Sequence, residues 1–185
     1  MSIIRFRPAL PYVGLPIIAT ALLILCLDRM ESFVLFRYEL IIVFGYVAAV
    51  LDLKMKRIPN SLVMAMLAIW VFIMTPALFI DTGAAVRLLK NAALGFAIGG
   101  GLFLLVYIIS HKGLGGGDVK FIAAAGLYLG FNGVIQTILF GTVLAALTGL
   151  ALILLKKIGR KDSIPLAPFL FAGILATVFL GGITI

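Results

Sequence analysis

The sequence His111-Lys112-Gly113-Leu114-Gly115-Gly116-Gly117-Asp118-Val119-Lys120 is a polar break in a very apolar chain. Apolar segments lie on both sides of it, at 99–110 and at 121–129. Three consecutive glycines carry no Cβ, so the backbone can turn sharply here and lie directly against another segment. An aspartate at the edge of an apolar span is costly in a membrane, and such acids usually mark functional sites. The stretch therefore predicts a membrane protein with a functional carboxylate at Asp118.

The composition indicates a membrane protein along the whole chain. Of the 185 residues, 64% are hydrophobic and 12% are charged, and the mean hydropathy is +1.27. A typical soluble domain has about 25% charged residues. The net charge of +8 does not indicate nucleic acid as a partner, because the basic residues lie in short segments between apolar runs, where they orient a membrane chain. The single cysteine excludes an internal disulfide and a Cys-based zinc site.

Apolar runs of membrane-spanning length predict an all-α polytopic helix bundle of six to seven transmembrane helices, in contact with membrane lipid. The first run, 9–27, lacks a small-x-small cleavage site, so we expect an extra amino-terminal helix that is retained. We expect a single domain over 1–185, with its catalytic core at 38–183. The expected helices are 9–27, 38–53, 60–80, 92–110, a short one at 119–129 followed by a turn at 130–133, then 134–155 and 165–183.

The loop charges predict the orientation of this bundle. Basic residues gather before 9–27 and in the segments 54–57, 111–120 and 156–161. The positive-inside rule places these segments, and with them the amino terminus, in the cytoplasm. This orientation requires the short helix at 119–129 to count as a crossing. Asp52, which ends the span at 38–53, and Asp118 then lie on the same, cytoplasmic, side.

Asp52 and Asp118 are the acids that border apolar spans on this expected cytoplasmic side. Each has an ordinary structural explanation, Asp118 as a helix N-cap and Asp52 as a partner of Lys56 one turn further on. Together they match a carboxylate pair in which one member accepts a proton from water and the other donates one. No His-Glu-x-x-His zinc motif and no Gly-x-Ser-x-Gly elbow is present. The main alternative is a non-enzymatic transporter or assembly scaffold that uses both acids for ion or proton binding.

Helix ends and glycines give three further expectations. The helix dipole favours the ionised form of Asp118, at the start of one helix, and leaves the proton on Asp52, at the end of another. The glycines at 115–117 are expected to include a residue with positive φ. Gly95 and Gly99 have the Gly-x-x-x-Gly spacing that predicts close packing against a second helix.

Three stretches, in this order, resemble the type IV prepilin peptidase family: Leu51-Asp52-Leu53-Lys54-Met55-Lys56-Arg57-Ile58-Pro59-Asn60, Gly115-Gly116-Gly117-Asp118-Val119-Lys120 and Ile164-Pro165-Leu166-Ala167-Pro168-Phe169. They are similar to the family's first aspartate motif, its Gly-x-Gly-Asp motif and the Pro-rich start of its last helix. The resemblance covers about 38–183. It implies that Asp52 and Asp118 are catalytic, with motif support from Gly115, Gly117, Lys120, Pro59 and Asn60.

The resemblance also implies an activity. It is that of a membrane-embedded aspartyl endopeptidase of the inner membrane, which removes the short basic leader from pilin or pseudopilin precursors at the cytoplasmic face. The family needs no metal or organic cofactor for this reaction. Its larger members carry a tetracysteine insert and methylate the new amino terminus. With one cysteine, this chain is expected to be a short, peptidase-only form.

Overall fold

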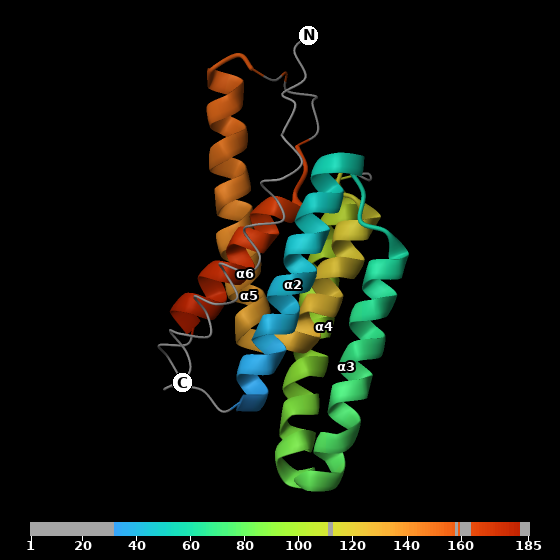
Figure 1. The fold of residues 1–185 in the computed structure, drawn as a ribbon. Helices are drawn as coiled ribbons and strands as arrows, with labels where there is room; N and C mark the ends of the chain where they lie inside the picture. The colour runs from blue at the N-terminus through green and yellow to red at the C-terminus, as the bar shows by residue number, and fades with distance from the viewer. Residues whose placement is uncertain (1–31, 111–112, 158, 160–163, 182–185) are drawn as a thin grey trace.

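The computed structural model describes residues 32–110, 113–157, 159 and 164–181, and these residues form helices and short connections (Figure 1). The helices α2 to α5 are each long and apolar enough to cross a membrane, and α6 is a shorter apolar helix. The all-α prediction is confirmed for this part of the chain. The expected helix at 9–27 lies outside the described residues, and the count of six to seven spans stays a prediction. The bounds are α2 (Ser32–Met55), α3 (Asn60–Ile80), α4 (Thr82–Ile109), α5 (Gly116–Leu154) and α6 (Ala167–Gly181).

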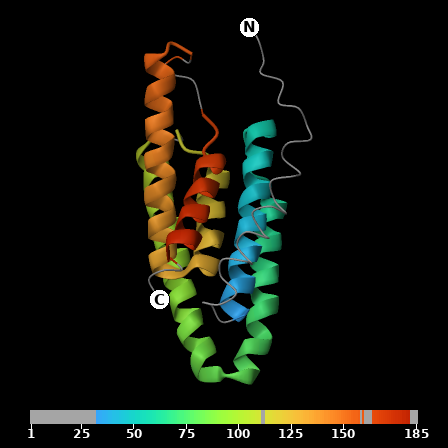
Figure 2. The same cartoon turned by 60° about the vertical axis from the view of Figure 1, so that its left-hand side comes forward.

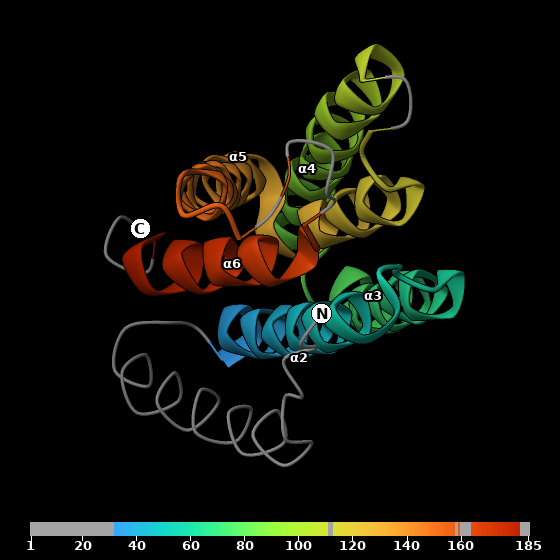
Figure 3. The ribbon, with the colours of Figure 1, turned by 90° about the horizontal axis from the view of Figure 1, so that it is seen from above.

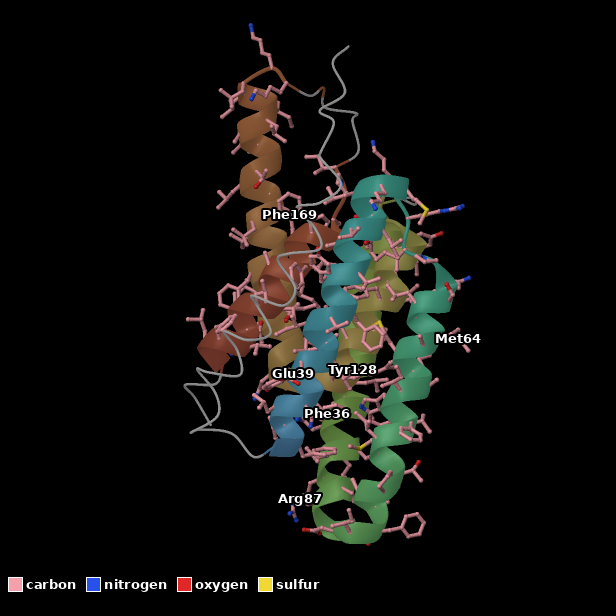
Figure 4. The ribbon with its side chains drawn as sticks, in the orientation of Figure 1. Phe36, Glu39, Met64, Arg87, Tyr128 and Phe169 are labelled. Atoms are coloured by element: carbon pink, nitrogen blue, oxygen red, sulfur yellow. The ribbon has the colours of Figure 1, made fainter. Side chains whose placement is uncertain are left out.

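Three chain segments gather at one end of the bundle, which we call the site end. The α2–α3 connection, the start of α5 and the start of α6 all lie there, and the α3–α4 connection lies at the opposite end (Figures 1 and 2). In Figure 4, Phe169 near the start of α6 and Arg87 in α4 mark the two ends. The arrangement brings three chain segments that are far apart in sequence to the same level of the bundle.

The bounds of α3 agree with the predicted helix, and those of α4 do not. Helix α3 starts after Pro59, which adopts an extended backbone conformation, φ −72° and ψ 146°. Helix α4 begins at Thr82, ten residues before the predicted start. The reason is that Asp81 ends α3 and also caps α4, since its Oδ1 accepts the N–H of Ala84 at 2.9 Å. Residues 82–91, which lie between the two predicted helices at 60–80 and 92–110, are therefore helical.

Helix α5 consists of two halves that meet at Gly130. This residue has φ 71° and ψ −173°, a conformation that side chains other than glycine rarely adopt. A predicted four-residue turn is thus one non-helical residue, and Asn91 of α4 accepts the N–H of Phe131 at 3.0 Å just after it. Both halves lie on the site-end side of this bend, which is well short of the α3–α4 connection (Figures 1 and 2). The half at 116–129 is about 21 Å long, too short to cross a hydrocarbon core of about 30 Å.

Side chains of α2 and α3 hold the end of this first half of α5. The last carbonyls before a helix break have no partner within the helix. Trp70 donates its Nε1–H to the carbonyl of Leu127 at 3.1 Å, and Arg37 donates from Nη2 to the carbonyl of Tyr128 at 2.5 Å. The Tyr128 hydroxyl in turn donates to the carbonyl of Met66 in α3 at 2.6 Å. In Figure 4, Tyr128 lies between α2 and α3. These bonds fix the half-helix whose opposite end carries Asp118.

Helices α4 and α5 pack backbone to backbone. A Cβ placed on Gly95 would overlap the carbonyl oxygen of Gly126, and one placed on Gly126 would overlap the backbone of Gly95. A Cβ on Gly99 would lie 2.8 Å from Val134 and 3.0 Å from the carbonyl oxygen of Ile122. The close packing predicted from the Gly-x-x-x-Gly spacing is confirmed, and its partner is α5.

Candidate active site

Asp52 lies in the last turn of α2 and is buried, with 5% of its surface exposed. Its Oδ2 accepts the backbone N–H of Ala167, the first residue of α6, at 2.9 Å. The residue before Ala167 is Leu166, whose side chain cannot accept a hydrogen bond. The carboxylate of Asp52 therefore takes the place of an N-cap side chain for a helix that begins 115 residues later in the sequence.

Asp118 lies in the first turn of α5, after the N-cap residue Gly115. Its Oδ1 is buried and has no hydrogen-bond partner among the residues that the structure describes. Its Oδ2 lies over Gly115, where an added Cβ would be only 2.6 Å away. Asp118, in the first turn of α5, and Asp52, in the last turn of α2, therefore lie at the same end of the bundle (Figure 1).

The segments around the two aspartates touch directly. A Cβ on Gly117 would lie 3.0 Å from the carbonyl oxygen of Ile58, a buried residue of the α2–α3 connection. Lys120 donates from Nζ to Oδ1 of Asn60 at 2.9 Å, which joins the start of α5 to the start of α3. The Gly-x-Gly-Asp segment and the Ile58-Pro59-Asn60 segment therefore pack against each other at the site end.

One expectation about this segment is wrong, and the assignment of the shared proton to Asp52 stays a prediction. The glycines at 115–117 do not supply a positive φ: Gly115 has φ −71°, and among the described glycines only Gly130 has φ above zero. Gly115 and Gly117 instead allow neighbouring atoms to approach closely, those of Asp118 and Ile58 respectively. The helix-end argument for the proton is also incomplete, because Asp52 lies at the amino end of α6 as well as at the carboxyl end of α2. Both carboxylates face a helix amino terminus, and the dipoles no longer distinguish them.

The backbone N–H of Ala167 is the polar group at this site that sequence reasoning missed. The Pro-rich stretch at 164–169 marks the start of a helix, but no sequence pattern shows which acid approaches it. The last helix begins at Ala167 rather than at Pro165, so Pro165 precedes α6 and Pro168 lies in its first turn. The described residues contain no group of three or more His, Cys, Asp or Glu side chains suited to a metal, and the cofactor-free expectation stays a prediction.

A model of the type IV leader peptidase family matches residues 39–150, which include both aspartates. The prepilin leader peptidase/N-methyltransferase of Bacillus subtilis (strain 168) is 31% identical over 136 residues, covering 73% of this chain and 52% of that protein. The protein of the same name from Burkholderia pseudomallei (strain 1026b) is 32% identical over 149 residues, covering 75% and 46%.

A third relative with this name, from Legionella pneumophila, is 30% identical over 132 residues, covering 71% of this chain and 45% of that protein. The chain spans about half the length of these curated relatives. No solved structure gives a significant match. The resemblance to this family is confirmed by the family match over 39–150, which contains two of the three stretches that carry it, and by the identities. The chain belongs to the type IV leader peptidase family.

Proposed function

We propose that this protein is a membrane-embedded aspartyl endopeptidase that removes the leader from pilin or pseudopilin precursors. The observation that supports it most is that the segment carrying Asp118 packs against the connection that follows Asp52, with Gly117 lying against Ile58 at the site end. The names of the relatives supply the substrate class, and the paired carboxylates supply the chemistry. The proposal is limited to the peptidase reaction, because these carboxylates are the reactive groups that the site brings together.

In the proposed reaction the two aspartates share one proton, since neighbouring carboxylates do not both ionise easily. The ionised member takes a proton from water, and the water oxygen attacks the carbonyl carbon of the scissile bond. The protonated member donates its proton to the carbonyl oxygen. When the tetrahedral intermediate collapses, the C–N bond breaks and the amine leaves with a proton from the pair. Because Oδ2 of Asp52 accepts the N–H of Ala167, the other oxygen of Asp52 is the one available to water.

Incubation of the purified protein with a pilin precursor tests this function against the transporter or scaffold alternative. We expect the precursor to lose the mass of its leader, measured by intact-mass spectrometry, without added metal or organic cofactor. A membrane protein that used its acids for ion or proton transfer would leave the precursor intact. An unchanged precursor mass with a folded, membrane-inserted protein would therefore contradict the proposal.

The site end is proposed to face the cytoplasm. The described basic residues of the site end are Lys54, Lys56, Arg57, Lys120, Lys156 and Lys157. The rest of the bundle carries fewer, namely Arg37 in α2 and Arg87 and Lys90 in α4. The positive-inside rule expects more basic residues on the cytoplasmic side, so the excess at the site end favours a cytoplasmic orientation of that end. In a background with Cys26→Ser, a cysteine at Arg57 should react with an impermeant thiol reagent only after the inner face is opened. A cysteine at Asp81 should react in intact cells, and labelling of position 57 in intact cells would invert the orientation.

The glycines that precede Asp118 should differ sharply in their tolerance of a methyl group. A Cβ at Gly115 would lie 2.6 Å from Oδ2 of Asp118, and one at Gly116 has its nearest neighbour, a ring carbon of Tyr107, at 4.0 Å. Because displacement of a catalytic group by about 1 Å costs on the order of 10²-fold in rate, Gly115→Ala should lower leader cleavage by about that factor. Gly116→Ala, the matched control, should cleave at close to the unmodified rate. Equal rates for the two variants, measured on the same precursor, would show that Asp118 is not held over Gly115.

A further inference from the structure

Arg37, in the second turn of α2, is a buried charge that the proposed reaction does not use. Its exposed fraction is 7%, and it lies in a helix that is long and apolar enough to cross a membrane. Its Nη2 donates to the carbonyl of Tyr128 at 2.5 Å, and its Nε has no hydrogen-bond partner among the residues that the structure describes. A charged side chain within an apolar span is costly, and such residues usually have a functional role. The bond to Tyr128 indicates that this role concerns the first half of α5.

The bond from Arg37 joins the two helices that carry the aspartates. Helix α2 runs toward the site end and holds Asp52 in its last turn, whereas α5 starts at the site end with Asp118 and runs back along the bundle (Figure 1). Seen from the site end, α6 lies between α2 and the second half of α5 (Figure 3). Arg37 and Phe44 of α2 both contact Tyr128 in the first half, Phe44 with its ring centroid 6.0 Å from that of Tyr128. Since Tyr128 lies ten residues after Asp118, Arg37 acts about 15 Å from Asp118 along the helix axis.

The other contacts of this half-helix leave its position relative to α2 open. The glycine packing of Gly95 and Gly99 fixes α5 against α4, which carries neither aspartate. The ring contact with Phe44 is not directional, so it resists sliding along the axis only weakly. The carbonyls at the carboxyl end of a helix point along its axis, and a donor bound to one of them opposes such sliding. The bond from Arg37 is therefore the contact best suited to fix the first half of α5 axially against α2.

We propose that Arg37 is a positioning residue, which holds the carbonyl of Tyr128 and thereby sets the position of Asp118 along α5 relative to Asp52. The inference rests on the proposed peptidase function. A helix transmits an axial shift from one end to the other, and displacement of a catalytic group by about 1 Å costs on the order of 10²-fold in rate. The charge of Arg37 also matches the negative end of the half-helix dipole. Trp70 supports the same end from α3, through the carbonyl of Leu127.

Removal of the donor tests the inference through kcat. Arg37→Met keeps a long unbranched side chain and loses every N–H, so the first half of α5 can shift. We expect kcat for a pilin precursor to fall about 10²-fold with KM little changed, the pattern of an interaction that acts on the transition state alone. Arg37→Lys keeps a cationic donor and should recover part of the lost kcat. Trp70→Phe keeps a ring and loses the N–H, so it should lower kcat in the same direction, and it carries the test if Arg37→Met does not fold.

A matched control separates positioning from stability. Thr137→Val also removes a buried hydrogen bond of α5, the contact of 3.0 Å between the hydroxyl oxygens of Thr137 and Thr177. This contact joins the second half of α5 to α6, on the other side of Gly130 from Asp118. Thr137→Val should therefore lower the unfolding midpoint and keep the unmodified kcat. Equal kcat losses in Thr137→Val and Arg37→Met would show that loss of stability alone explains both, and would overturn the inference.

A second measurement needs no cleavage. In a background with Cys26→Ser, spin labels on cysteines at Leu53 and Gly116, two exposed positions beside the aspartates, report the distance between the helix ends. Electron paramagnetic resonance should give a narrow distance distribution for this background, a shifted or broader one with Arg37→Met, and an unchanged one with Thr137→Val.

The two measurements distinguish failure of this inference from failure of the proposed function. If the unmodified protein cleaves and folded Arg37→Met keeps both kcat and the distance distribution, the positioning role is overturned and the peptidase proposal stands. If the unmodified protein cleaves no precursor, the peptidase proposal is overturned, and the distance distribution alone decides whether Arg37 fixes the two helix ends.

Discussion

Asp52→Asn is expected to reduce leader cleavage by about 10²–10⁴-fold, the usual contribution of a positioned acid or base, while the protein still folds and accumulates. The asparagine amide can neither hold nor release the shared proton. Its carbonyl oxygen can still accept the N–H of Ala167, the bond that Oδ2 of Asp52 makes at 2.9 Å. The change therefore removes the chemistry and keeps the cap of α6. Cleavage is measured as the initial rate of leader release, and folding as the thermal unfolding midpoint in detergent.

Two comparison variants separate catalysis from capping. Asp52→Ala should lose the same activity and in addition about 0.5–2 kcal/mol of stability, the cost of removing a helix cap. Asp81→Asn changes an aspartate that also accepts a helix N–H, from Ala84 at 2.9 Å, at the opposite end of the bundle. It should cleave at the unmodified rate. Substantial cleavage by folded Asp52→Asn would show that Asp52 is a capping residue only.

Gly95→Ala is expected to have the largest effect on stability. The new Cβ would meet the backbone of Gly126 and Gly130, and no flexible side chain is there to move aside. Overpacking of a core costs about 1–3 kcal/mol, and a backbone contact belongs at the upper end of that range. With about 2–4 °C per kcal/mol for a chain of this size, the midpoint should fall by about 6–12 °C. The fluorescence of Trp70, which contacts α5 through Leu127, reports the transition.

Gly101→Ala is the matched control on the same helix. Its Cβ has no described neighbour within 4 Å, and alanine favours a helix over glycine by up to about 1 kcal/mol. The midpoint should therefore stay the same or rise. Equal midpoints for the two variants would mean that α4 and α5 do not pack backbone to backbone at Gly95.

Sequence patterns could predict the features of this molecule that depend on neighbouring residues. Pro59 and the apolar run after it define α3, and Gly130 in an apolar stretch marks the break in α5. The start of α4 could not be predicted in the same way, because Asp81 followed by Thr82-Gly83 is as typical of a turn as of a cap. The structure distinguishes the two through the hydrogen bond to Ala84.

The identity of the acids could be predicted, but not their surroundings. Asp52 and Asp118 are conspicuous as carboxylates beside apolar spans. The contact of Asp52 with Ala167 joins residues 115 apart, and nothing local encodes it. Trp70 and Arg37 likewise support α5 through carbonyls that become available only because the helix breaks at Gly130. Such contacts depend on tertiary packing, which periodicity and composition do not specify.

The joint action of Asp52 and Asp118 is tested most directly by the cleavage rates of four proteins on one pilin precursor. These are the unmodified protein, Asp52→Asn, Asp118→Asn and the double variant, each with its unfolding midpoint. Groups that act as one unit are strongly non-additive, so the loss of either should cost as much as the loss of both. We predict rapid leader release by the unmodified protein and the same low residual rate, or none, in all three variants. A near-unmodified rate in either folded single variant, or a double variant whose loss is the product of the two single losses, would contradict a shared catalytic pair.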